Sequence, residues 1–308
     1  MPVDREGAGA MRVRDALVRA QAALRTAGST SPVLDAEVLL AHVLGADRAA
    51  LYAAPERELT QGQVARYREL VAQRLDGVPV AYLTGRKEFM GLDFQVNPAV
   101  LIPRPETELM VERALALLQD LPRPLVVDVG TGSGAVAVSI ARHHPGAVVY
   151  AVDIAAAALE VAGANARRHG VTERVLCLEG DLLGPLPAGV ARQVDLICAN
   201  LPYVPSPDFP HLPREVRHEP RLALDGGPDG LGVYRRLVPQ AARFLRPGGH
   251  LLMEIDPRQA REALSLVPAP DWVVFIERDL SGKERLVVGR YSEAAKRGGA
   301  SGGELRGG

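Results

Sequence analysis

The alternation of strand and helix patterns between residues 125 and 290 constrains the fold of this chain more than any other feature. Short apolar runs at 125–129 and 148–152 are each followed by a polar or glycine-rich turn and then by a helical pattern, which ends at His143 or His169. Further strand patterns follow at 174–180, 194–200, 250–255, 272–278 and 284–290. Because parallel strands need crossover connections, this order predicts an α/β fold with a mostly parallel sheet and helices on both faces.

The part of the chain before this alternation carries helical patterns and no strand pattern. Ser31-Pro32 offers an N-cap followed by a proline at the first helical position, and Thr60-x-x-Gln63 is a capping box. We therefore expect a small helical domain at 11–83, of the kind that more often recognises a partner than performs chemistry. The total of 308 residues is long enough for two domains of about 100–200 residues each.

The period changes between the two patterned regions. The run EFMGLDFQV alternates around Gly91, and Val100, Leu101 and Ile102 follow an Asn-Pro turn, which predicts a β-hairpin or two short strands at 84–104. We expect this hairpin to link the helical domain to a second domain at 105–290, which opens with a helix after Pro105.

Composition narrows the classes of protein further. No apolar run approaches the ~18 residues of a membrane span and no hydrophobic signal region follows the first charges, so we expect no membrane association and a cytoplasmic location. A formal net charge of −1 does not favour a stable nucleic-acid partner. Cys177 and Cys198 lie in apolar runs and are expected to be reduced core residues. We also expect no metal site, a monomer, and disordered tails at 1–10 and 291–308.

A glycine-rich loop follows the first strand of the second domain and opens a helix. Such a loop lets the main chain approach a ligand and directs free helix N–H groups at it. Ala135 stands where the dinucleotide fingerprint would place its third glycine, which favours a ligand without a pyrophosphate. The candidate ligand-binding residues in this loop are Asp128, Gly130, Thr131, Gly132, Ser133 and Gly134.

Two acidic residues follow the next strands. Asp153 ends the second strand about 20 residues after the loop, where it is placed to bind ribose hydroxyls; an N-cap for the following helix is the alternative. Asp181, after the third strand, is placed to accept a hydrogen bond from an adenine amino group, and a turn-forming aspartate is the alternative there.

The fourth strand ends directly in Asn200-Leu201-Pro202-Tyr203. This sequence places the Asn200 side chain beside the main-chain carbonyl of Leu201 or Pro202, at the edge where open α/β sheets bind ligands. Two acceptors about one peptide apart suit a planar NH₂ group, so we expect an amide or an exocyclic amine as the guest. Tyr203 is expected to pack on this flat group and exclude water, with a core aromatic as the alternative.

Together these motifs resemble a class I S-adenosylmethionine-dependent methyltransferase, which has a Rossmann-like, mostly parallel seven-stranded sheet. The stretches at 79–112 and 215–237 resemble the PrmC/HemK family of glutamine N5-methyltransferases, and the likeness spans about residues 11–290. The resemblance implies methylation of the side-chain amide nitrogen of the glutamine in the Gly-Gly-Gln loop of class I peptide chain release factors. It also implies that Gly130 to Gly134 and Asp153 hold S-adenosyl-L-methionine, that Asp181 and Leu182 border its adenine, and that Asn200, Pro202 and Tyr203 hold the amide.

The chain departs from this family at two points. Leu201 stands where the family usually has proline, a form that resembles adenosine methyltransferases acting on ribosomal RNA, and EIDPRQ at 254–259 replaces a glycine-containing turn. Two alternatives therefore remain: adenine amino methylation of RNA or DNA by the same pocket, and a nucleotide-binding or NAD module without methyl transfer. A basic face would favour the first alternative, and a dehydrogenase should lack Asn-x-Pro-Tyr.

Overall fold

The structure is a computed structural model that describes residues 11–292. Of the tails expected at 1–10 and 291–308, residues 1–10 and 293–308 lie outside the described residues. The chain divides into two compact units: one takes in the described residues up to Arg86 together with Pro213–His218, and the other takes in 87–212 and the described residues from Glu219 onward. The boundary therefore falls at Arg86, three residues beyond the expected end of the helical domain, and a distant segment joins that domain.

The first unit is helical, as the sequence predicts. Its helices are α1 (Val13–Thr26), α2 (Pro32–Leu44), α3 (Arg48–Ala53), α4 (Gln61–Leu75) and α5 (Val80–Thr84). Leu24, Leu39, Leu51 and Leu70 form part of a continuous buried core. The capping box at Thr60 and Gln63 is present with both of its hydrogen bonds.

A buried ion pair holds this unit together. The Arg74 guanidinium donates to Asp35 at 2.8 Å, and both side chains are almost completely buried. Ser31 is the N-cap of α2 and Pro32 its first residue, as expected, but Ser31 Oγ donates to Asp35 at 2.8 Å and makes no capping bond to the main chain. Arg74 also pairs with Glu215, which lies in the segment Pro213–His218.

The second unit is built on a seven-stranded sheet of order β5-β4-β3-β6-β7-β9-β8. Its strands are β3 (Leu125–Val129), β4 (Val148–Asp153), β5 (Val175–Glu179), β6 (Val194–Ala199), β7 (Leu245–Glu254), β8 (Trp272–Arg278) and β9 (Glu284–Tyr291). Every neighbouring pair from β5 to β7 is parallel, and β9 runs antiparallel to both of its neighbours. The expected mostly parallel α/β sheet is confirmed.

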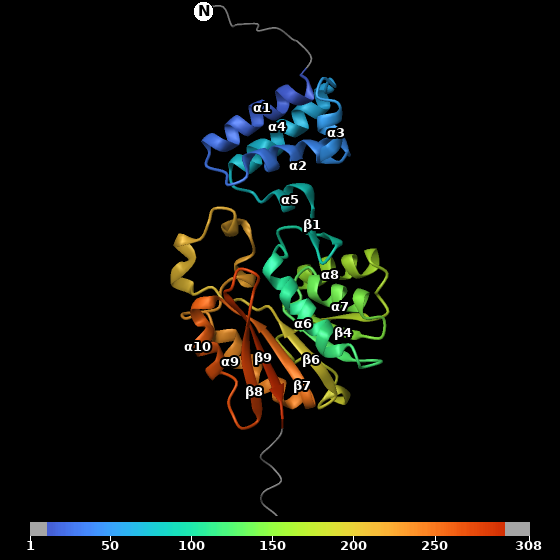
Figure 1. Cartoon of the computed structure of the whole chain (residues 1–308), viewed down its shortest axis with the longest axis vertical. Coiled ribbons are helices and arrows are strands. Elements are labelled where there is room, and N and C mark those ends of the chain that lie inside the picture. Colours follow the sequence, from blue (N-terminus) through green and yellow to red (C-terminus); the bar gives the residue numbers. More distant parts are fainter. Residues whose placement is uncertain (1–10, 293–308) are drawn as a thin grey trace, which may run out of the picture. The chain divides into compact units, whose positions relative to one another are not determined.

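Helices cover both faces of this sheet. They are α6 (Glu108–Leu118), α7 (Ala135–His143), α8 (Ala156–Arg168), α9 (Gly232–Phe244) and α10 (Ala260–Ser265). Figure 1 shows α6, α7 and α8 on one side of the sheet and α9 and α10 on the other, and a separate apolar core fills each side. The order of the strands reverses between β3 and β6. Ligands of open α/β sheets bind at such a switch point, outside the carboxyl ends of the strands.

Short 3₁₀ helices fill several connections. They are η1 (Pro105–Thr107), η2 (Ala188–Val190), η3 (Ser206–His211), η4 (Val216–His218), η5 (Arg221–Ala223) and η6 (Pro257–Gln259). The helix expected directly after Pro105 therefore begins as η1 and continues as α6. None of the helices within residues 11–292 is long and apolar enough to cross a membrane.

The linking hairpin is shorter than the sequence pattern indicates. Its strands are β1 (Arg86–Phe89) and β2 (Leu92–Gln95), joined by Met90 and Gly91, which both have positive φ. Val100–Ile102 form no strand and line a cavity or pack beside it, so the second strand run is wrong. At the other end of the domain, β9 continues through Tyr291, one residue beyond the expected boundary.

Candidate active site

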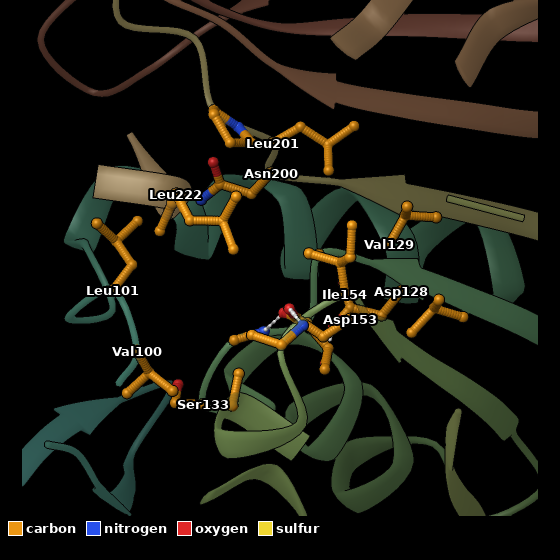
Figure 2. Close-up of a pocket in the computed structure, with 18 of the residues that line it drawn as sticks. Val100, Leu101, Asp128, Val129, Ser133, Asp153, Ile154, Asn200, Leu201 and Leu222 are labelled. Carbon is orange, nitrogen blue, oxygen red and sulfur yellow. Dashed lines mark hydrogen bonds between the residues drawn. The ribbon is translucent and has the colours of Figure 1, made fainter. Parts of the chain in front are cut away.

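A cavity of about 260 Å³ lies at the carboxyl ends of β3, β4 and β6. Figure 2 shows Asn200 and Leu201 on one side of this cavity, with Asp153 and Ser133 across from them. All the candidate residues line it except Gly134 and Tyr203. The sheet topology therefore brings together motifs that lie far apart in the sequence.

The glycine loop forms the floor of the cavity in a conformation that requires glycine. Gly130 has φ of +71°, and a Cβ placed on it would lie 2.8 Å from Leu201 Cδ2. Gly134 has φ of +78°, and its Cβ would lie 3.1 Å from that of Ala162, which sets how closely α7 and α8 pack. At these two positions glycine allows close packing against Leu201 and Ala162, whereas Gly132, with φ of +54°, meets only the Gly130 carbonyl at 4.0 Å and leaves the main chain open to the cavity.

Asp128 holds the glycine loop in place through two hydrogen bonds. Its carboxylate, which is 2% exposed, accepts hydrogen bonds from Thr131 Oγ1 at 2.6 Å and from the Ala137 N–H at 3.2 Å. Burial raises the pKa of Asp128 to about 6. Both of these bonds are internal, so Asp128 shapes the loop in addition to lining the cavity.

Asp153 connects the loop to the second strand. Its two carboxylate oxygens accept from Gly132 N–H at 2.9 Å and from Ala155 N–H at 3.0 Å, and both bonds are drawn in Figure 2. Ala155 is the N-cap of α8, so the alternative that Asp153 caps this helix is wrong. Each carboxylate oxygen can accept a further hydrogen bond. Binding of ribose hydroxyls by Asp153 stays a prediction.

Asp181 and Leu182 line the same cavity beyond β5. The Asp181 side chain forms an ion pair with Arg236, which also lines the cavity, and both side chains are about half exposed. Leu182 is buried and has φ of +52°. The expected role of these two residues at an adenine ring stays a prediction.

Asn200 lies directly after β6, and its side chain has one partner among the described residues. Its Nδ2 donates to Thr107 Oγ1 at 3.1 Å, which leaves Oδ1 as an unused acceptor. The main-chain carbonyls of Leu201 and Pro202 also accept no hydrogen bond within residues 11–292. The expected pair of acceptors is thus present beside the cavity.

Leu201 makes a bond that proline could not make. Its N–H donates to the Tyr234 hydroxyl at 3.1 Å, and the same hydroxyl donates toward the carbonyls of Ala199 and Glu254. Tyr234 lies on α9 and is completely buried. Its hydroxyl therefore joins the ends of β6 and β7 and fixes the main chain on both sides of Asn200.

The segment after β7 has a structural explanation. Asp256 accepts a hydrogen bond from Arg258 N–H and caps η6, which places Gln259. Gln259 Nε2 donates to the carbonyls of Tyr203 at 2.8 Å and Asp229 at 2.9 Å. EIDPRQ thus holds the main chain that follows Asn200.

Tyr203 is the candidate whose position differs most from expectation. It packs against the core cluster that includes β6 and α9, and it does not line the cavity. Burial raises the pKa of Tyr203 above its usual value. Its expected contact with a substrate amide stays a prediction, and the core-aromatic alternative agrees with its packing.

The loop after β6 supplies one wall of the cavity, through Pro220, Leu222, Ala223 and Asp225. Leu222, which is 61% exposed, and Leu101 both face the cavity region in Figure 2. Glu219 is buried and joins this wall to the linker, because it accepts from the Ile102 N–H at 3.0 Å and pairs with Arg104.

Sequence reasoning missed the residues that act behind this surface. Thr107, Tyr234 and Gln259 hold the Asn200 segment, and Asn165 joins β2 to the glycine loop through bonds to Gln95 and Ser133. Thr107, Tyr234 and Gln259 lay in segments that were singled out from the sequence, at 79–112, 215–237 and 254–259, but none of the three was assigned a role. A buried polar residue on a helix carries no local pattern that marks its partner.

Two family models match the chain. The PrmC N-terminal domain matches residues 15–85, and a methyltransferase domain matches residues 126–219. The protein of Moorella thermoacetica named release factor glutamine methyltransferase is 48% identical over 259 residues, which cover 84% of this chain and 90% of that protein. Proteins of the same name from Koribacter versatilis and Deinococcus radiodurans are 44% and 41% identical, and each match covers 91% of this chain and 99% of the relative.

Proposed function

The chain belongs to the release factor glutamine methyltransferase family, and on that premise we propose that it methylates the side-chain amide nitrogen of a release factor glutamine with S-adenosyl-L-methionine. The observation that carries this proposal is the pair of unused acceptors after β6. Asn200 Oδ1 and a carbonyl of Leu201 or Pro202 can each accept one hydrogen of a primary amide.

The residues of the cavity fit S-adenosyl-L-methionine. Gly132 has positive φ, and a Cβ built on it would meet only the Gly130 carbonyl at 4.0 Å, so the main chain is open to the cavity at this point. Asp153 keeps acceptor capacity for ribose hydroxyls, and Ala135 in the third glycine position favours a nucleoside without pyrophosphate. When bound, this cofactor supplies a methyl group on a sulfonium, which is already a strong electrophile.

The protein's own task is to position and polarise the amide. An amide nitrogen is a poor nucleophile because its lone pair is delocalised into the carbonyl group. Acceptance of both N–H hydrogens, by Asn200 Oδ1 and by a main-chain carbonyl, increases electron density on the nitrogen as it attacks. The proton is lost after attack from a nitrogen that is then strongly acidic, so no strong base is needed. Preorganised acceptors can thus supply much of the catalysis.

The substrate is an intact class I release factor, which presents the glutamine of its Gly-Gly-Gln loop. A free glutamine has too little surface to use a separate helical unit, whereas a folded protein can dock on it and insert the side chain into the cavity. Remote contacts then orient the reacting amide. We place the enzyme in the cytoplasm as a monomer without a stable nucleic-acid partner.

Adenine amino methylation is the alternative that Leu201 raises, and it is not favoured. The net charge of −1 offers little attraction for phosphates, and relatives that match across nearly their whole length carry the glutamine methyltransferase name. In structural terms, Leu201 keeps the acceptors in place through its bond to Tyr234.

The proposal can be tested by incubating the enzyme with methyl-labelled cofactor and three acceptors in parallel. These are an intact release factor, a short peptide carrying its Gly-Gly-Gln loop, and ribosomal RNA. We expect label in the intact factor and little in the peptide or the RNA. Label in RNA alone would support the adenine reading, and equal rates on the peptide and the factor would remove the role proposed for the helical unit.

Replacement of Asp153 by alanine is expected to weaken cofactor binding by about 10- to 150-fold. The change removes charge-assisted hydrogen bonds worth about 1.5–3 kcal/mol each, and it also releases Gly132 N–H. Titration calorimetry measures the effect directly. Glu160→Ala, which removes an exposed carboxylate from α8 outside the cavity, is the matched control. Equal affinity of the Asp153 variant and the wild type would contradict the assignment.

A further inference from the structure

The orientation of the Asn200 carboxamide decides whether this site can work. The two ends of a carboxamide have nearly the same shape, but only the oxygen end can accept a hydrogen from the substrate amide. If the group turned over, its NH₂ would face the NH₂ of the glutamine, and donor would meet donor. Something in the structure must therefore select one of two orientations that occupy the same space.

The selecting contact is made by Thr107, the last residue of η1. Its Oγ1 accepts from Asn200 Nδ2 at 3.1 Å, and it is 4% exposed, so water does not compete for it. A threonine hydroxyl has one proton and two lone pairs. It could therefore turn its proton toward Asn200 and favour the wrong orientation unless a third group holds that proton.

Glu254, at the end of β7, is placed to hold it. Its side chain is 1% exposed, and neither carboxylate oxygen meets a donor in hydrogen-bonding geometry among the described residues. The hydroxyls of Thr107 and Tyr203 lie close enough to lower its pKa, although burial dominates and raises that pKa to about 7. A carboxylate so deeply buried needs hydrogen-bond donors, and these two hydroxyls are its neighbours.

We propose that Thr107 and Glu254 are positioning residues that fix the substrate-binding orientation of Asn200. Ionised Glu254 accepts the Thr107 proton, the lone pairs of Thr107 then accept from Asn200 Nδ2, and Asn200 Oδ1 is left to face the glutamine amide. The negative charge also polarises this chain of hydrogen bonds toward Asn200 Oδ1. This inference rests on the proposed function, because it concerns the binding of that amide.

Glu254 acts through Thr107 and does not touch the substrate. It does not line the cavity, whereas Thr107 and Asn200 both do. Its main-chain carbonyl accepts a hydrogen bond from Tyr234, which also holds Leu201, so β7 is tied to the segment that carries Asn200. Direct removal of a proton from the substrate by Glu254 is therefore not part of the proposal.

The arrangement predicts an acid limb in the pH–rate profile, that is, a fall in the rate of methyl transfer at low pH. Four groups face Glu254 and affect its pKa in addition to burial. Glu106 raises the pKa, and Arg285 and the hydroxyls of Thr107 and Tyr203 lower it. The ionised carboxylate can only accept a proton from Thr107, whereas the protonated carboxyl can donate to Thr107 Oγ1 and favour the opposite orientation of this chain of hydrogen bonds. Turnover at saturating substrate should therefore fall as the pH drops through about 7 and level off above it.

Three substitutions separate this role from a structural one. Thr107→Val keeps the shape and removes the hydroxyl, and it should lower kcat on intact release factor about tenfold or more. Thr107→Ser restores the hydroxyl and should recover most of the activity. Glu254→Gln keeps an acceptor without the charge; it should lower kcat by a smaller factor of about 3–10 and abolish the acid limb near pH 7.

Two further readouts keep the proposal falsifiable. Calorimetric affinity for S-adenosyl-L-methionine and the melting temperature should stay near wild type in all three variants. Ser139→Ala, which removes a buried hydroxyl without a hydrogen-bond partner among the described residues, is the control for loss of a buried oxygen and should leave the kinetics unchanged. If Thr107→Val fails to fold, the pH profile of Glu254→Gln still decides.

The outcomes distinguish this inference from the proposed function. Suppose that the wild-type enzyme methylates release factor. Full kcat in Thr107→Val, or an unchanged acid limb in Glu254→Gln, would then overturn the positioning role alone. Wild-type enzyme that leaves the factor unmethylated would overturn the proposed function itself. Loss of activity in Thr107→Val without recovery in Thr107→Ser would also contradict the inference, because the hydroxyl would then not be the feature that matters.

Discussion

Replacement of Asn200 by alanine is expected to lower the rate of methyl transfer by about 10²–10³-fold, the usual cost of removing one preorganised group that stabilises a transition state. The change removes one of the two acceptors for the substrate amide and leaves one N–H of the glutamine without a partner in a cavity partly closed to water. The fold should persist, because the Asn200 side chain makes a single hydrogen bond within residues 11–292, to Thr107.

Single-turnover kinetics with saturating cofactor measure this effect without interference from product release. Gln193→Ala, which removes an exposed carboxamide just before β6, is the matched control and should react at the wild-type rate. Normal turnover by a folded Asn200 variant would show that the amide is held in some other way. A melting temperature equal to that of wild type establishes that the variant is folded.

Arg74→Met is expected to destabilise the helical unit by about 3–5 kcal/mol, because breaking one side of a buried ion pair leaves the other charge without compensation. In the part of the chain that the structure describes, Asp35 would keep only the hydroxyls of Ser29 and Ser31 as partners. Methionine fills much of the same volume, so the effect reports the lost charge and not a cavity. Glu215 would lose its bond to Arg74 as well.

Denaturant unfolding followed by circular dichroism tests this expectation. Arg66→Ala on the same helix removes an exposed pair with Glu69 and should cost less than about 1 kcal/mol. A loss of less than about 1 kcal/mol in Arg74→Met would mean that the buried pair contributes no more than a surface pair. A second consequence concerns Pro213–His218, which should become more accessible to proteases when Glu215 is released.

Patterns local in the chain predicted most of the fold. The alternation of strand and helix patterns predicted the parallel sheet. Each pattern can be recognised locally, because the spacing of its apolar residues depends on which face of the element is buried. The Thr60 capping box likewise gave the start of α4, since both of its bonds lie within one turn. The run at Val100–Ile102 misled because an apolar segment beside a cavity has the same composition as a short strand.

The site was predictable where a motif follows a strand. Asp153 ends a parallel strand and Gly130 and Asn200 each directly follow one, and parallel strands align their carboxyl ends at one edge. Thr107 and Glu254 were not predictable, because each meets Asn200 or its partner only after the sheet has assembled. The contacts of the segment Pro213–His218 were not predictable for the same reason. In the helical unit, this segment pairs with Arg74 and donates to the main-chain carbonyl of Leu75.

The central claim is that Asn200 and the adjacent carbonyls present a release factor glutamine amide for methylation. Mass spectrometry of a class I release factor after incubation with enzyme and S-adenosyl-L-methionine tests this directly. We expect one added methyl group on the side-chain nitrogen of the glutamine in its Gly-Gly-Gln loop, and none when the Asn200→Ala enzyme replaces the wild type over the same interval. An unmodified glutamine, or a methyl group on any other residue of the factor, would contradict the account.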